Sequence, residues 1–377
     1  MTRQTGLNTR CVHAAHAPEA GTGAIAEPIY LTTTFEREAD GTYPHGYRYS
    51  REGSPNRAAL ESCMAALEGG IGAVAFASGL AANMAVLELL RAGDHVIAPL
   101  AAYYGTLKQL TEYARERGVT VDVADFSNPA AVKAVLTTRT RLVWIETPAN
   151  PLLSITDLAR VTAIGHEAGA WVVCDNTFAT PVCQHPFDFG VDFVIHSGTK
   201  YLGGHSDVLS GLVVVRENAE GLERLQSWQR LAGAVLGPFD CWLLRRSIAT
   251  LGLRVRAQCK NALRVAEYLA AHSAVAQVYY PGLAQHPGHA VAAAQMPGGF
   301  GGVLSVCMAG GSAAAFDTAR RTRFFTRATS LGGVESLIEH RASIEGAGSS
   351  TPENLLRLSI GIEDAEDLID DLAEALA

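Results

Sequence analysis

Lysine is the rarest basic residue of this chain and the one whose position suggests chemistry. Only four lysines stand beside 26 arginines, at positions 108, 133, 200 and 260. Lys108, Lys133 and Lys260 fall in stretches with helical patterning, where a lysine is usually a solvated surface residue. Lys200 follows an apolar run at 192–196, and a lysine at the carboxyl end of a strand can lose its proton by desolvation and act as a nucleophile. The alternative is that Lys200 is an ordinary lysine of a loop without a catalytic role.

Two further segments carry residues that complement such a lysine. Asp175 ends the apolar run 171–175, and a carboxylate there is costly to bury without a cationic partner, although a helix cap explains it equally well. Ser78, Gly79 and Leu80 form a small-residue turn from strand to helix, where backbone N–H groups suit a phosphate, although most such turns bind nothing. A lysine for a Schiff base, an acid for a ring nitrogen and a phosphate anchor are together what pyridoxal phosphate requires. The sequence therefore predicts a site for this cofactor.

The elements that must position these residues are strands alternating with helices. This pattern predicts an α/β fold with a mostly parallel seven-stranded sheet covered on both faces. Residues 71–90 are apolar, but polar interruptions favour a strand that turns into a helix over a membrane span. The seven predicted strands lie at 73–77, 95–100, 120–126, 141–145, 171–175, 192–196 and 208–215.

Breaks in the pattern predict three parts. Residues 1–58 form an N-terminal arm that reaches a neighbouring subunit, 59–235 a large cofactor-binding domain, and 236–377 a smaller α+β domain. A long amphipathic helix is expected over 239–273, with a break near Gly252. The small domain also has predicted strands at 275–280, 302–308 and 355–360 and predicted helices at 312–321 and 365–376.

Composition narrows the class of protein. The chain has 377 residues and a formal net charge of −8, without a basic block, which makes nucleic acid a poor partner. The seven cysteines are widely spaced and form no C-x-x-C pair, so they predict neither a disulfide framework nor a zinc site. We therefore expect a cytoplasmic protein that binds neither metal nor membrane. The first 20 residues lack the apolar segment of a signal peptide.

The motifs together make the chain recognisable. It resembles the Cys/Met-metabolism family of pyridoxal-phosphate enzymes, which contains cystathionine γ-synthase, cystathionine γ-lyase, methionine γ-lyase and the O-acylhomoserine sulfhydrylases. The resemblance runs from Val12-His13 to the segment 356–363, and its most specific part is Ser-Gly-Thr-Lys-Tyr-Leu-Gly-Gly-His-Ser-Asp at 197–207. It implies the aminotransferase-like architecture known as fold type I, and a homotetramer, a dimer of dimers with shared active sites.

The resemblance also implies a role for each matching residue on the cofactor side. Lys200 would form the Schiff base and then carry protons, and Asp175, supported by Thr177, would pair with the ring nitrogen. Tyr104 would stack on the cofactor ring and protonate a leaving group. The phosphate would be held by Ser78, Gly79, Leu80, Ser197 and Thr199, together with Tyr49 and Arg51 of a neighbouring subunit.

On the substrate side the resemblance points to three residues. Arg357 would clamp the substrate α-carboxylate, because its planar fork gives bidentate recognition. Ser330 would line the substrate side near the lysine, and Asn150 would lie near the phenolic oxygen of the cofactor. A purely structural role is the alternative for each of them.

The expected reaction is that of a carbon–sulfur lyase, with γ-elimination from a sulfur amino acid of the methionine, homocysteine or cystathionine type; the same site can also run β-elimination. The alternative is a γ-replacement transferase, either a cystathionine γ-synthase or an O-acylhomoserine sulfhydrylase. A cofactor-binding protein without turnover is a further alternative, which the intact residue set argues against. Nicotinamide binding is set aside, because no G-x-G-x-x-G turn follows a first strand.

Four departures from the family pattern bear on specificity. Thr329 stands where enzymes that handle cystathionine generally have glutamate, and Thr106 stands where methionine γ-lyases commonly have cysteine. Arg230 replaces an asparagine of many relatives, and either selects an acidic substituent or makes a surface ion pair. The run 340–346 lacks the Pro-Ala-Ser-Met-Thr-His pattern of many members. We therefore expect an unusual substrate entrance.

Overall fold

The larger of two sheets confirms the predicted α/β fold. The computed structural model describes residues 5–345 and 351–377; residues 1–4 of the predicted arm and Gly346 lie outside this range. Of its seven strands only β7 runs against the others, so the remaining six point their carboxyl ends to one edge. In spatial order they are β1 (Gly72–Phe76), β7 (Gly211–Val215), β6 (Phe193–Ser197), β5 (Trp171–Asp175), β4 (Thr140–Glu146), β2 (His95–Pro99) and β3 (Thr120–Ala124).

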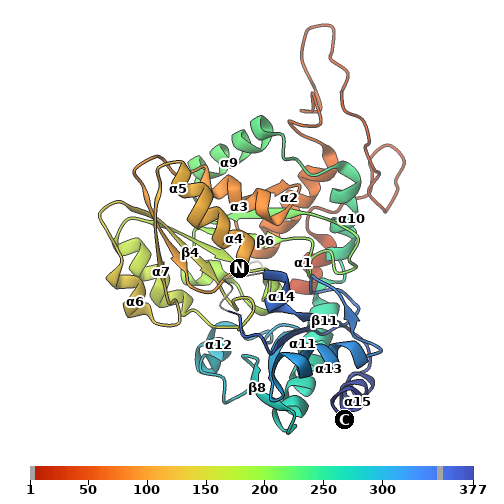
Figure 1. Ribbon diagram of the computed structural model, residues 1–377. Helices are drawn as coiled ribbons and strands as arrows, with labels where there is room; N and C mark the ends of the chain where they lie inside the picture. The colour runs from red at the N-terminus through yellow and green to blue at the C-terminus, as the bar shows by residue number, and fades with distance from the viewer. Residues whose placement is uncertain (1–4, 346–350) are drawn as a thin grey trace.

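Helices cover both faces of this sheet (Figure 1). Successive strand residues point to opposite sides, so Val172 belongs to one apolar cluster and Val173 to the other. This is why the strands read as continuous apolar runs. One face packs against α2 (Pro55–Glu68), α6 (Pro129–Ala134), α7 (Leu158–Glu167) and α10 (Pro238–Ile248), and the other against α3 (Gly79–Leu87), α9 (Ala219–Ala232) and the continuous helical segment α4 (Tyr104–Lys108), η1 (Gln109–Tyr113) and α5 (Ala114–Glu116).

The second sheet has five strands and packs against long helices at the carboxyl-terminal end of the chain (Figure 1). Its order is β10 (Thr326–Arg327), β11 (Leu337–His340), β12 (Leu355–Ser359), β9 (Val303–Met308) and β8 (Val275–Tyr279). Helices α11 (Leu251–Ala270), α13 (Gly311–Arg321) and α15 (Ala365–Leu376) contribute to its core. The remaining helices are α1 (Leu7–His13), α8 (Thr180–Cys183), η2 (Pro186–Phe189), α12 (His289–Gln295) and α14 (Arg341–Glu345). The domain limits at 58 and 235 stay a prediction.

The long helix expected over 239–273 is interrupted near Gly252, as predicted, at residues 249–250. Helix α10 ends at Ile248 and α11 begins at Leu251, so Gly252 lies within the first turn of α11. A Cβ atom at Gly252 would meet Asn8 Oδ1 of α1. The glycine therefore allows α1 to approach closely and does not break the helix.

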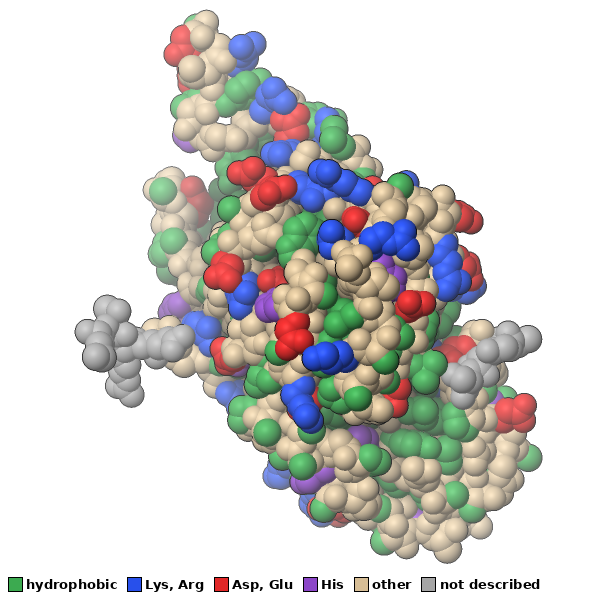
Figure 2. Space-filling view, turned by 90° about the vertical axis from the view of Figure 1, so that its left-hand side faces the viewer, with side chains coloured by type: hydrophobic (Ala, Val, Ile, Leu, Met, Phe, Trp, Pro, Cys, Tyr) green, Lys and Arg blue, Asp and Glu red, His purple; other side chains and the backbone are tan. Residues whose placement is uncertain are grey.

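The segment from about residue 14 to residue 53 has neither helices nor extended strands, and it projects from the body at the top of Figure 1. Ile25 and Leu31 are 70% and 71% exposed on it. On the face in Figure 2, acidic and basic side chains are mixed. No helix in the described part of the chain is long and apolar enough to cross a membrane. All seven cysteines are buried free thiols.

Candidate active site

A cavity of about 310 Å³ lies at the edge where the carboxyl ends of the parallel strands meet. This is the edge at which ligands collect in open α/β sheets. Residues from both sheets and from the loops between them line the cavity. The predicted site residues among them are Ser78, Gly79, Leu80, Tyr104, Asn150, Asp175, Thr177, Ser197, Thr199, Lys200, Ser330 and Arg357.

Lys200 lies in the loop after β6, where its side chain is partly buried. Its Nζ donates a hydrogen bond to Ser330 Oγ at 2.9 Å. Burial lowers the pKa of Lys200 to about 8, and the nearby charge of Arg357 adds to the effect. Lys108, Lys133 and Lys260 are exposed on helices, as predicted. Of the four lysines, only Lys200 lines this cavity.

Asp175 ends β5 and lies on the cavity wall next to Thr177. The backbone N–H of Thr177 donates to Asp175 Oδ1 at 2.9 Å, and Thr177 Oγ1 accepts from the backbone N–H of Ser197 at 2.8 Å. Burial raises the pKa of Asp175. A carboxylate in such a place needs a cationic partner, and a protonated ring nitrogen is one.

The reasoning that identified Asp175 applies equally to Glu146, which the sequence analysis overlooked. Glu146 ends the neighbouring strand β4, and its Cα pairs in register with that of Asp175. Burial raises the pKa of Glu146 to about 8, and the charge of Asp175 adds to the shift. Its two carboxylate oxygens accept hydrogen bonds from the backbone N–H groups of Tyr103 and Asn150, both at 2.9 Å. Glu146 therefore ties together the loops after β2 and β4.

The small-residue turn after β1 forms the amino-terminal end of α3. Ser78 caps this helix by accepting a hydrogen bond from the backbone N–H of Ala81 at 3.1 Å. A Cβ atom at Gly79 would lie 3.1 Å from Ser197 Cβ, so any other residue at position 79 would narrow the space between these two residues. Thr199 Oγ1 bonds to the backbone of Ser210 at the same end of the cavity. Hydroxyls and helix N–H groups converge there, as a phosphate requires.

Tyr104 begins α4 beside the cavity and is 38% exposed. Its ring stands edge-on to that of Tyr103, with centroids 4.8 Å apart. Burial raises the pKa of Tyr103 to about 12, so this phenol keeps its proton at neutral pH. A face of Tyr104 can stack on a flat ring, and its hydroxyl can exchange a proton.

Arg357 on β12 lies on the opposite wall, from the second sheet. Its guanidinium donates to Asn150 Oδ1 at 3.1 Å and to the backbone oxygen of Ser330 at 2.9 Å, and it pairs with Glu339 Oε2 at 2.6 Å. Burial lowers the pKa of Arg357 to about 10. Ser330 holds a left-handed backbone, with φ of 85°, and so contacts both Lys200 and Arg357.

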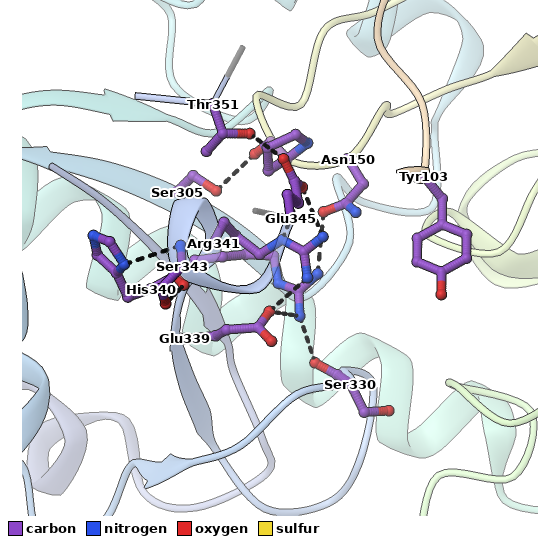
Figure 3. A network of polar contacts seen from close by, with 12 residues as sticks. Tyr103, Asn150, Ser305, Ser330, Glu339, His340, Arg341, Ser343, Glu345 and Thr351 are labelled. Carbon is purple, nitrogen blue, oxygen red and sulfur yellow. Dashed lines mark hydrogen bonds and ion pairs between the residues drawn. The ribbon is translucent and has the colours of Figure 1, made fainter. Parts of the chain in front are cut away.

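Glu339 belongs to a charged network that the sequence analysis did not predict (Figure 3). It lies on β11, and its Oε2 pairs with Arg357 and also with Arg341 Nη1 at 2.9 Å. Arg341 also pairs with Glu345 at 2.7 Å. The departure of 340–346 from the family pattern was the available signal, and its described part places Arg341 and Ile344 on the cavity wall.

Three predicted residues lie outside the cavity of their own chain. Tyr49 and Arg51 are on the projecting arm, and Arg51 Nη1 donates to the backbone oxygen of Arg230 at 2.8 Å. Arg230 is exposed at the end of α9. The reach of Tyr49 and Arg51 into a neighbouring site stays a prediction. Thr106 and Thr329 do line the cavity; Thr106 is buried and accepts from Asn83 Nδ2 at 2.9 Å, while Thr329 is exposed.

Comparison with known proteins decides the family. The model of the Cys/Met metabolism PLP-dependent enzymes matches residues 8–377. The chain belongs to this family. It is 47% identical to a cystathionine γ-synthase of Mycobacterium tuberculosis over 99% of this chain and 97% of the relative, and 44% identical to a cystathionine β-lyase of Lactococcus lactis over 99% of both. A solved cystathionine γ-synthase from Xanthomonas oryzae, in complex with aminoacrylate and cysteine, has a TM-score of 0.94, is 42% identical and covers 99% of this chain and 98% of that one.

Family membership confirms the predicted cofactor and fold type I. The cavity fits pyridoxal phosphate: it offers a phosphate cradle that a Cβ at Gly79 would narrow, a buried acid at Asp175 and an amine of lowered pKa at Lys200. The chain is therefore a pyridoxal-phosphate enzyme of transsulfuration.

Proposed function

We propose that this enzyme is a carbon–sulfur lyase that eliminates the sulfur substituent of cystathionine or a related sulfur amino acid. The observation that carries the proposal is the position of the Lys200 amine, hydrogen-bonded to Ser330 and beside the buried guanidinium of Arg357. An amine and a carboxylate-binding group thus lie near each other in one cavity, joined through Ser330, as an α-amino acid substrate needs.

The remaining roles follow from charge and position. Bound pyridoxal phosphate would supply an electrophilic carbonyl carbon and a ring that accepts electron density from the substrate. Asp175 would keep the ring nitrogen protonated, the turn at 78–80 with Ser197 and Thr199 would hold the phosphate, and Tyr104 would stack on the ring. Lys200 would move protons between substrate carbons, because a pKa of about 8 allows both of its forms near neutral pH.

Elimination needs only cystathionine and water. Cleavage at the γ-carbon gives cysteine, 2-oxobutanoate and ammonia, whereas cleavage at the β-carbon gives homocysteine, pyruvate and ammonia. The lyase relative from Lactococcus supports this direction, because its name is that of an enzyme that breaks cystathionine.

A second candidate is γ-replacement, in which a thiol displaces the acyloxy group of an activated homoserine ester. The mycobacterial relative favours it, since the 47% identical protein is named a synthase. Both candidates would use the same cavity residues up to the point at which a thiol or water reacts.

Product analysis separates the two candidates. The holoenzyme is incubated with L-cystathionine, L-methionine or L-homocysteine alone, and separately with O-acetyl- or O-succinylhomoserine plus L-cysteine. The lyase proposal predicts a 2-oxo acid from a sulfur amino acid without added thiol. If neither 2-oxobutanoate nor pyruvate forms unless a homoserine ester is supplied, the lyase proposal is wrong. Lys200→Ala should lack both activities.

We also propose that the enzyme is a homotetramer in which the arm brings Tyr49 and Arg51 to the phosphate of a neighbouring subunit. The exposed Ile25 and Leu31 support an arm that is covered by another chain. Arg51→Ala should weaken pyridoxal phosphate binding, although Arg51 lies outside the cavity of its own chain. Equal affinity in the variant and the wild type would refute the shared site, and the molar mass from light scattering tests the tetramer.

A further inference from the structure

Arg341 is a second arginine in the wall of the active-site cavity. It stands where the family pattern noted above has proline, so many relatives lack this side chain altogether. Only 4% of the side chain is exposed, and it nevertheless lines the cavity that contains Lys200 and Arg357. A cationic side chain that is buried at this place must be compensated by negative charge, because burying an unpaired charge is costly. Its position in the cavity wall also raises the question of what it binds.

The network in Figure 3 provides the compensation without using the whole guanidinium. Arg341 donates from Nε and Nη2 to Glu345 Oε1, and from Nη1 to Glu339 Oε2. An arginine carries five N–H groups, so these bonds leave one N–H on each terminal nitrogen without a partner in the described structure. A carboxylate can accept a hydrogen bond from each terminal nitrogen of a guanidinium.

The charges on the cavity wall show what this arginine could bind. The cations among the described lining residues are Lys200, Arg357 and Arg341. Lys200 is assigned to the cofactor and Arg357 to the α-carboxylate of the substrate, so Arg341 is the cation without an assigned ligand. The lining carboxylates, Glu146 and Asp175, lie at strand ends of the other sheet.

The neutral residue at position 329 supports the same conclusion. Thr329 is exposed and lines the cavity together with Ile344 from α14. Family members that handle cystathionine generally have a glutamate there, which can meet a distal ammonium group. In this chain that negative charge is replaced by a hydroxyl, while a positive charge has been added at 341. The charge preference for the distal end of the substrate is therefore shifted toward an anion.

We propose that Arg341 is a specificity-determining residue that binds a carboxylate beyond the scissile bond of the substrate. The preferred amino acid would then carry two carboxylates, one held by Arg357 and the other by Arg341. This inference rests on the proposed function of the cavity as the site of an α-amino acid. It applies equally to elimination and to replacement.

The test compares two amino acids that differ only in the distal charge. L-2-Aminoadipate ends in a carboxylate, whereas L-norleucine has a methyl group in its place, and neither carries a leaving group. Binding of each to the holoenzyme is followed through the absorption of the cofactor. The wild type should bind aminoadipate at least about tenfold more tightly than norleucine, and Arg341→Met should lose this preference while norleucine affinity stays within about twofold.

The same experiment distinguishes binding of the distal carboxylate by Arg341 from a purely structural role of this residue. If Arg341 only neutralised Glu339, Arg341→Met would weaken both ligands equally, because both use Arg357. Equal loss, or a preference that survives in the variant, overturns the proposal. If Arg341→Met does not fold, Arg341→Gln is measured instead, and a wild type that binds norleucine as tightly as aminoadipate overturns the proposal without any variant. Because neither ligand has to react, failure of the lyase proposal would not be mistaken for failure of this one.

Discussion

Substitution of Glu339 by glutamine tests the charged network most sharply. Oε2 of Glu339 is shared by two guanidiniums, 2.6 Å from Arg357 Nη2 and 2.9 Å from Arg341 Nη1. The three side chains are only 4% to 5% exposed. A glutamine whose carbonyl oxygen replaces Oε2 keeps both hydrogen bonds and removes the negative charge, while its NH2 group takes the place of Oε1, a buried oxygen without a hydrogen-bond partner in the described structure. Two buried cations would then share one remaining carboxylate, that of Glu345.

The expected cost follows from this burial. Removing one member of a buried ion pair destabilises a protein by about 3 to 5 kcal/mol, and because the acceptor is kept we expect about 3 kcal/mol for Glu339→Gln. The matched control is Glu374→Gln in the same part of the chain. Glu374 pairs with Arg323 at 2.9 Å, but both side chains are mostly exposed, so its loss should cost about 0.5 kcal/mol or less.

Urea unfolding of the cofactor-free proteins, followed by circular dichroism, measures both variants under one condition. Removal of the cofactor matters because a ligand that binds only the folded state adds to its stability. If the two substitutions lower the free energy of unfolding by the same amount, Glu339 does not compensate two buried arginines. A second consequence concerns Lys200: the charge of Glu339 raises the pKa of Lys200, so its loss should lower that pKa below about 8.

Three shorter predictions concern the cofactor. Burial lowers the pKa of Lys200 to about 8, so half of the amine is uncharged at this pH. The rate at which apoprotein captures pyridoxal phosphate should therefore be half-maximal near pH 8 and level off above it; a rate that is half-maximal only near the ordinary value of 10.5 would contradict the burial of this amine. Asp175→Asn should weaken cofactor binding by about 10- to 100-fold, because a charge-assisted hydrogen bond is lost, and a dissociation constant equal to that of the wild type would remove Asp175 from the site. Gly79→Ala should weaken cofactor binding by about tenfold or more, because the added methyl group would lie 3.1 Å from Ser197 Cβ. The control is Gly6→Ala: an added Cβ there has no atom within 4 Å, so cofactor affinity should stay unchanged.

The sequence was sufficient to predict the residues that sit at strand ends. Lys200 and Asp175 each follow an apolar run, and the parallel order of the strands then brings them to one edge. The same rule would have found Glu146, which directly follows the predicted strand 141–145. Three of the four lysines could be dismissed for the opposite reason, because they lie on exposed helix faces.

The network around Glu339 could not be predicted by such a rule. Glu339 lies inside the short strand β11, where a charged residue weakens the apolar pattern. Its partners come from β12 and α14, and nothing in the local sequence indicates which charges will meet. The close contact at Gly252 could not be predicted for a related reason: its partner, Asn8 of α1, is remote in sequence.

The central claim is that Lys200 is the lysine that binds the cofactor. Reduction of the holoenzyme with borohydride fixes the cofactor to its lysine, and mass spectrometry of the peptides then identifies the residue. The claim predicts that the phosphopyridoxyl group is found on the peptide that contains Lys200. Its recovery on Lys108, Lys133 or Lys260 would contradict the assignment of this cavity as the active site.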